Sequence, residues 1–134
     1  MSWNSGALIR QVMAVSTYEI PREAWRSYFE ALTDVLGAVE ATVEVVGRDV
    51  GAQVADERQI LTDMTYDDRD DVIVVGLDAP GSTAERVEHL IEHPQQILVA
   101  TGEPPPLEVT YDIEDGEHHQ WLIRLERPPA LPGE

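Results

Sequence analysis

The sequence contains no cysteine and no lysine. Without thiols the chain has no disulfide framework, no thiolate nucleophile and no zinc site built from cysteine. The apolar stretch from Ala7 to Val15 is interrupted by Arg10 and is not followed by a cleavage site, so we expect no signal peptide. Beyond it the longest apolar run is 72–77, far too short to span a bilayer. We therefore expect a cytoplasmic protein without membrane contact.

Positive charge is scarce, because nine arginines face 26 acidic residues and leave a net charge of −17 at pH 7. An acidic surface repels phosphate backbones, so we expect no nucleic-acid partner. Acidic, lysine-free surfaces are typical of a high-salt cytoplasm, where ions screen the repulsion. The alternative explanation is a basic protein partner, whose binding the acidic surface would favour.

The 134 residues have the usual length of a single domain, and 43% of them are hydrophobic, enough for one core. We interpret residues 1–17 as an N-terminal arm or edge strand, residues 18–127 as one domain and residues 128–134 as a tail. The predicted fold class is α+β. It comprises an N-terminal amphipathic helix, about six mostly antiparallel short strands, and a second short helix between strands three and four.

The first helix is predicted to begin at Pro21, which suits the first helical position, with Glu23 complementing the helix N-terminus. Gly37 is expected in the C′ position that ends it. The hydrophobic residues between them have helical spacing and predict one buried stripe. These residues are Trp25, Phe29, Leu32 and Leu36.

Alternating and β-branched residues then predict three antiparallel strands, over 40–46, through about residue 66, and over 72–75, with turns at 47–51 and 67–71. The capping box at 82–85 predicts the second helix, which ends at Pro94. Strands over 96–100 and 107–113 follow. For the last hairpin we predict a three-residue loop, 114–116, with Gly116 left-handed and Val109 paired with Trp121.

Four short motifs resemble a small uncharacterised bacterial family catalogued only as a domain of unknown function. The resemblance covers about residues 18–131. It implies no activity, cofactor or catalytic residue. The motifs lie at Ile20-Pro21-Arg22-Glu23-Ala24-Trp25, Gly51-Ala52-Gln53-Val54, Tyr66-Asp67-Asp68-Arg69-Asp70-Asp71-Val72 and His89-Leu90-Ile91-Glu92-His93-Pro94.

His89, Glu92 and His93 fit the H-x-x-E-H string of inverted zinc peptidases, in which two histidines one helical turn apart bind zinc and the glutamate activates water. The predicted helix, however, ends directly after His93, and no third ligand is identifiable. A histidine near a helix C-terminus is also favoured by the helix dipole. We keep His89 and His93 as candidate metal ligands, and assign no catalytic residue and no cofactor.

Three further features have a functional and a structural interpretation. The carboxylates of 67–71 suit a hard cation, but they lack the EF-hand pattern and are interpreted as a turn. His118 and His119 are adjacent on a strand, point to opposite faces and are expected to be exposed. Trp3 and Trp121 are candidate anchors for a partner, although the predicted hairpin places Trp121 in the core.

The sequence predicts a globular domain and shows no set of catalytic residues. This favours a non-enzymatic accessory or protein-interaction domain, with a protein partner or self-association. The alternative is a small-molecule or metal-binding domain, possibly hydrolytic, that uses His89, Glu92 and His93. A third hypothesis is an acidic protein that mimics phosphates and binds basic proteins.

Overall fold

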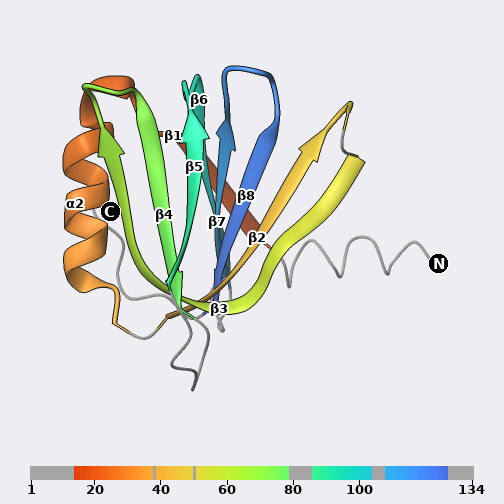
Figure 1. The fold of residues 1–134 in the computed structure, drawn as a ribbon. Helices are drawn as coiled ribbons and strands as arrows, with labels where there is room; N and C mark the ends of the chain where they lie inside the picture. Colours follow the sequence, from red (N-terminus) through yellow and green to blue (C-terminus); the bar gives the residue numbers. More distant parts are fainter. Residues whose placement is uncertain (1–13, 38, 50, 79–85, 104–107, 127–134) are drawn as a thin grey trace.

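The computed structural model describes residues 14–37, 39–49, 51–78, 86–103 and 108–126. They form one antiparallel sheet of eight strands and one α-helix, which lies beside β3 and β4 (Figure 1). The sheet order is β1-β6-β7-β8-β2-β3-β4-β5. The elements are β1 (Ala14–Glu19), the 3-10 helix η1 (Arg22–Ala24), α2 (Trp25–Val35), β2 (Val39–Gly47), β3 (Gly51–Asp67), β4 (Val72–Asp78), β5 (Val87–Glu92), β6 (Gln96–Glu103), β7 (Glu108–Glu114) and β8 (Gln120–Glu126).

The predicted α+β class with two helices and about six strands is wrong, because the described residues are mostly β-sheet. The second predicted helix overlaps β5, which pairs with β4 throughout its length. Ile91 is fully buried whereas Leu90 is 52% exposed, so this segment alternates with the period of a strand. Its few apolar residues fit the period of a helix as well as that of a strand, and pairing with β4 makes the segment a strand. The proposed cap at 82–85 lies outside the described residues.

The first helix is confirmed, beginning with the 3-10 turn after Pro21 and continuing as α2. Gly37 has the predicted left-handed conformation, with φ of 64°. Thr33 fixes the helix on β3, because its hydroxyl donates to the Met64 carbonyl (2.8 Å) and accepts from the Met64 amide (3.1 Å). The predicted stripe is buried throughout, namely Trp25, Phe29, Leu32 and Leu36.

The predicted meander is also confirmed, since β2, β3 and β4 pair antiparallel in sequence order. Gly51, with φ of 66°, closes the β2–β3 hairpin opposite Gly47. The Asp67 carboxylate accepts from the amides of Arg69 (2.9 Å) and Asp70 (3.2 Å), which makes the predicted turn. The first half of β3 extends beyond its pairing with β4, whereas β2 stays paired with β8 up to Val46, next to the tip of the β2–β3 hairpin (Figure 1).

The predicted register of the last hairpin is wrong by four residues. Val109 pairs with Leu125, and Trp121 pairs with Ile113, so the loop spans residues 115–119. Because four is an even number, the predicted inward faces are retained. The left-handed residue of the loop is His118, with φ of 67°, instead of Gly116.

The sheet curls back on itself through the short connection from β5 to β6. The amide of Gly116 in the β7–β8 loop donates to the Glu92 carbonyl at the end of β5 (3.1 Å). A Cβ on Gly116 would lie 2.8 Å from the Cβ of His93, closer than such atoms approach, so this contact requires glycine. The curl encloses a core of inward residues from β2 to β8, namely Ala41, Val43, Leu61, Met64, Ile73, Val75, Leu77, Ile91, Ile97, Val99, Val109, Tyr111, Ile113, Ile123 and Leu125.

The helix also contacts β7 across this core. The hydroxyl groups of Tyr28 and Tyr111 lie 3.0 Å apart, and their rings meet edge to face. Burial, together with the neighbouring Tyr111, raises the pKa of Tyr28 far above its ordinary value, so the phenol of Tyr28 stays neutral. The two tyrosines therefore share a hydrogen bond in the middle of an apolar core.

At the N-terminus, residues 14–19 form the edge strand β1, which pairs with β6. Edge strand was one of the two interpretations of residues 1–17. Residues 1–13 and the predicted tail, 128–134, lie outside the described residues. None of the helices in the described ranges has the length and hydrophobicity that crossing a bilayer requires.

Candidate functional site

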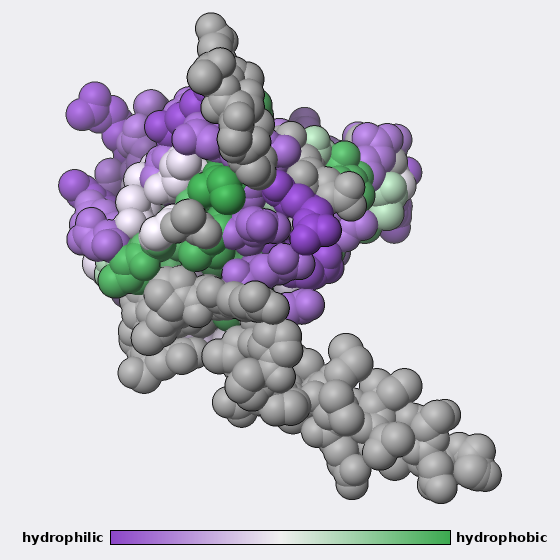
Figure 2. Space-filling view, turned by 90° about the horizontal axis from the view of Figure 1, so that it is seen from below, coloured by the Kyte–Doolittle hydropathy of each residue, from purple (hydrophilic) through white to green (hydrophobic). Residues whose placement is uncertain are grey.

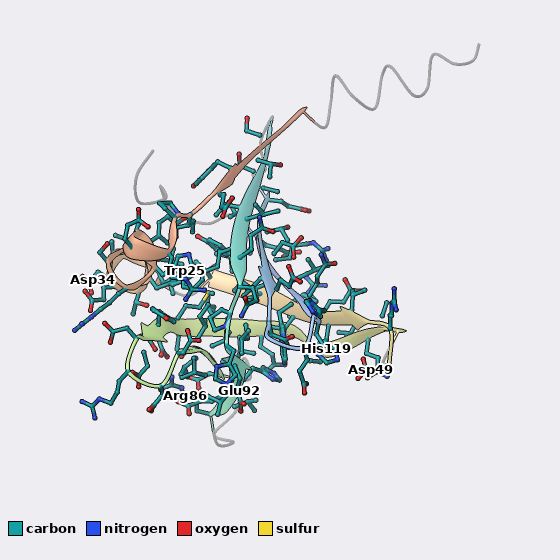
Figure 3. All side chains as sticks on the ribbon, turned by 90° about the horizontal axis from the view of Figure 1, so that it is seen from above. Trp25, Asp34, Asp49, Arg86, Glu92 and His119 are labelled. Atoms are coloured by element: carbon teal, nitrogen blue, oxygen red, sulfur yellow. The ribbon has the colours of Figure 1, made fainter. Side chains whose placement is uncertain are left out.

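A half-open groove with a volume of about 620 Å³ lies beside β5, on the side of that strand away from β4. Figure 3 labels two of its lining residues, Glu92 on β5 and His119, and His119 lies near Asp49 on the side of the molecule away from the helix residues Trp25 and Asp34. The groove is lined by Val45, Leu90, Glu92, His93, Gln95, Asp115, Gly116, Glu117, His119 and Trp121.

The apolar part of the groove comes from three strands. Trp121 on β8 packs against the core and remains partly exposed, and its ring lies 5.8 Å from that of His89 on β5. Val45 on β2 is paired with Trp121 and lies beside it. Leu90 on β5 is 52% exposed at the rim. The groove thus offers apolar contact area that water covers in the free protein.

Asp115 organises the polar wall, and at 8% exposure it is the buried charged residue of the described chain. Its Oδ1 accepts from the amides of Glu117 (2.8 Å) and His119 (2.9 Å), and its Oδ2 accepts from the Trp121 indole (3.1 Å). Burial alone would raise the pKa of this carboxyl, but these three hydrogen bonds outweigh burial and lower it. Asp115 is therefore ionised and holds both the loop and the indole in place.

His119 joins the β7–β8 loop to the β2–β3 hairpin. Its Nε2 lies 2.7 Å from Asp49 Oδ1 and its Nδ1 lies 3.3 Å from Asp115 Oδ2. The hydrogen bond with Asp49 raises the pKa of His119, and the charge of Asp115 adds to this effect against desolvation. A Cβ on Gly47 would come within 2.5 Å of the imidazole, so glycine there makes room for the ring.

A second hollow of about 560 Å³ lies on the other side of His119. Its lining joins the tips of the β2–β3 and β7–β8 hairpins, so the imidazole forms part of the wall of both spaces. The lining residues are Arg48, Asp49, Glu117, His118 and His119.

The candidate metal ligands from the sequence do not share a helical face, because they lie on β5 and in the turn after it. His89 points inward to Trp121, whereas His93 lies in a left-handed turn (φ 53°) with its Nδ1 3.3 Å from Asp71 Oδ2. Glu92 and His93 line the groove and His89 does not. In the part of the chain that the structure describes, no group of three His, Asp or Glu side chains is arranged to hold a metal ion.

Asp71 belongs to a separate cluster at the turn before β4. Its Oδ1 accepts from the Tyr66 hydroxyl (2.7 Å) and lies 3.6 Å from the Arg22 guanidinium. The Tyr66 hydrogen bond is the largest influence that lowers the pKa of Asp71, and His93 and Arg22 act in the same direction. Arg22 also donates to the Pro94 carbonyl (2.9 Å), so the cluster ties the helix to the β5–β6 turn. We assign it a structural role.

Sequence reasoning missed Asp49, Asp115 and His119 as a unit. The prediction that both adjacent histidines are exposed holds for His118, whose side chain is 82% exposed, and is wrong for His119, which is 14% exposed. The sequence does contain a signal, the turn dipeptide Asp115-Gly116, because an aspartate in a turn often accepts hydrogen bonds from nearby backbone amides. Trp121 packs on the core, as the predicted hairpin requires, and it also lines the groove, while its role as an anchor for a partner stays a prediction. Trp3 lies outside the described residues.

The fold defines a mainly antiparallel β protein with one covering helix. Residues 16–134 match a family of unknown function (DUF5335), and the chain belongs to this family. A protein of Aquifex aeolicus (strain VF5), described as uncharacterized, is 35% identical over 118 residues, which cover 88% of this chain and 97% of that protein. No solved structure matches the chain.

Proposed function

We propose that this protein is a non-enzymatic interaction domain of the cytoplasm that binds a partner protein in the groove beside β5. The observation that carries the proposal is the combination of an edge of β5 with which none of the described strands pairs and a groove lined by Leu90 and Trp121. Exposed hydrophobic area in a concave surface marks binding sites, and a partly buried tryptophan is a typical anchor.

The polar groups of the groove support binding in preference to covalent chemistry. The hydrogen bonds of Asp115 and His119 are made within the protein, where they fix the loop that walls the groove. The described residues of the lining include no serine, threonine, tyrosine or cysteine side chain, so among them no hydroxyl or thiol nucleophile faces the groove. A rigid wall and an apolar floor are the features that a docking site requires.

Site-specific crosslinking in cells tests this function. A photoreactive amino acid replaces Leu90, which is 52% exposed at the groove, and a matched control replaces Val35, which is 49% exposed on the helix. We expect a discrete protein adduct from position 90 that is absent from position 35, and direct binding of the purified adduct partner to the unmodified chain.

Two results would contradict the proposal. Equal adducts at both positions would show random collisions, and no adduct at position 90 would show an unoccupied groove. Stoichiometric metal in the purified protein, lost on replacing His89 and His93 by alanine, would favour the alternative of a metal-binding domain instead.

A further inference from the structure

The hydrogen-bonding direction of β5 decides which residues face the groove. The His93 amide donates to the Asp71 carbonyl (2.9 Å), on the β4 side. In an antiparallel ladder these bonds alternate, so residues 91 and 89 also point to β4 and residues 92, 90 and 88 point away. The Glu92 carbonyl fits this pattern, because it accepts from Gly116 on the opposite side. The amide and carbonyl groups of Leu90 and Glu88 therefore lie along the free edge.

The side chains around this edge combine an apolar centre with negative charge. Glu88 and Glu92 flank Leu90 on the same face of the strand, since side chains two residues apart share a face. Arg86 pairs with Glu88 (3.2 Å) and also with Asp63, so Glu88 is partly neutralised. The described part of the groove lining holds three carboxylates, those of Glu92, Asp115 and Glu117, and no arginine.

The surface away from the groove is largely hydrophilic. Seen from below, on the side opposite the β7–β8 loop, hydrophilic residues cover much of the described surface and hydrophobic residues gather in smaller areas (Figure 2). The whole chain carries a net charge of −17. A ligand that combines apolar side chains with positive charge therefore complements both the groove and the field around it.

A second copy of this chain is a poor occupant of the edge. Antiparallel pairing of two β5 strands about Leu90 would place Glu88 of one copy opposite Glu92 of the other, twice. Like charges directly across from each other destabilise a strand pair. Two chains of charge −17 also repel each other before contact. These charges favour a basic partner over self-association.

We propose that the groove takes an extended, basic segment of a partner protein, which adds to β5 as a further strand. The inference rests on the proposed function and specifies its partner. The backbone of the segment pairs with the Leu90 and Glu88 edge, its apolar side chains contact Leu90 and Trp121, and its arginine or lysine side chains lie near Glu92 and Glu117. Main-chain pairing supplies affinity, and the alternate side chains supply specificity.

Three matched peptides test the mode of binding to the full chain by fluorescence polarisation. Each is about six residues long, the usual length of a strand. The first carries a valine to lie opposite Leu90, arginines two residues to either side of it to lie opposite Glu88 and Glu92, and valines at the positions between. The second replaces arginine with glutamate, and the third keeps the first sequence but carries N-methyl groups at alternate amides. We expect the first peptide to bind, the glutamate peptide not to bind, and the N-methylated peptide to bind about tenfold more weakly or worse because strand hydrogen bonds are lost.

Variants of the chain locate the site. Leu90→Pro removes the amide that faces the free edge and leaves the β4 ladder intact, whereas Leu90→Ala keeps that amide and removes the side chain. We expect Leu90→Pro to abolish binding of the arginine peptide and Leu90→Ala to weaken it. Glu92→Gln with Glu117→Gln is a second test that leaves the backbone unchanged, and we expect about three- to tenfold weaker binding at low salt.

Amide hydrogen exchange gives a direct readout of strand addition. We expect the peptide to slow exchange at Leu90 while Ile91, already bonded to β4, changes little. Equal binding of the arginine and N-methylated peptides, or no change at Leu90, would overturn the added strand. If crosslinking at position 90 captures a partner whose binding does not change with Glu92→Gln and Glu117→Gln, the inference fails and the proposed function stands. If neither a partner nor the peptide binds, both fail.

Discussion

The two ends of the curled sheet are stabilised in different ways. Where α2 covers the sheet, Phe29 and Leu32 are fully buried against apolar neighbours, and the space between helix and strands is filled. At the groove, the walls depend on Asp115 and His119, which form hydrogen bonds and ion pairs around a space that remains open. Apolar packing stabilises a closed core, whereas a site that must stay open is shaped by directed polar contacts.

The largest loss of stability is expected at the helix-covered end. Phe29→Ala removes a side chain with no exposed surface, and we expect the free energy of unfolding to fall by about 3–5 kcal/mol. Urea unfolding followed by circular dichroism measures this change. Ala31→Gly, at an exposed position of the same helix, is the control for helix propensity and should cost about 1 kcal/mol. Equal losses would show that Phe29 is not part of the core.

A smaller loss is expected at the groove. Asp115→Ala removes three hydrogen bonds and leaves the Trp121 indole without this acceptor, so we expect a loss of about 1–3 kcal/mol. The same urea titration measures it. Asp49→Ala, in which an exposed carboxylate is removed, is the matched control and should cost less. A loss as large as that of Phe29→Ala would remove the contrast between the two ends.

The polar wall should also depend on pH. The folded pKa of His119 is raised, so its stabilisation is fully present below the unfolded pKa of about 6.5 and is lost as pH rises through the folded value. The lowered pKa of Asp115 keeps that partner ionised in this window. We expect the stability difference between the wild type and His119→Gln to shrink as pH increases.

Thermal unfolding across this pH window measures the effect, and NMR titration of the imidazole locates its midpoint. The control is His118→Gln, because His118 is 82% exposed beside Glu114 and exposed ion pairs contribute little. The same pH dependence in both variants would contradict the role assigned to His119.

The smallest effect on stability is expected for Leu90→Ala, because this side chain is 52% exposed at the rim of the groove. We expect a change within about 0.5 kcal/mol, as for most surface substitutions. Urea unfolding of Leu90→Ala, run in parallel with Phe29→Ala, measures this change. A loss above about 2 kcal/mol would show that Leu90 belongs to the core and is not a docking residue.

The elements that the sequence predicts correctly carry their own local signals. The stripe from Trp25 to Leu36 has helical spacing over several turns, and the turn at Asp67 is made by its own carboxylate. β5 has no such signal, because its few apolar residues fit either period and a distant strand, β4, selects one. Tertiary pairing therefore determined the fold class where local pattern was ambiguous.

The candidate site was less predictable than the fold, for a related reason. Asp49 and His119 are separated by 70 positions and meet only because β2 and β8 pair side by side. The H-x-x-E-H string, by contrast, is contiguous, and its interpretation depended on a helix that does not form. A short motif indicates a particular chemistry only when the secondary structure of its residues is known.

The position of β8 in the sheet has a consequence for folding during synthesis. In the described residues β8 joins the group of β1, β6 and β7 to the group of β2 to β5, because it pairs with both β7 and β2. Among the described strands it is also the last to leave the ribosome. Until residues 120–126 emerge, the nascent chain consists of two unjoined half-sheets with exposed edges, so it depends on rapid completion or on protection from aggregation.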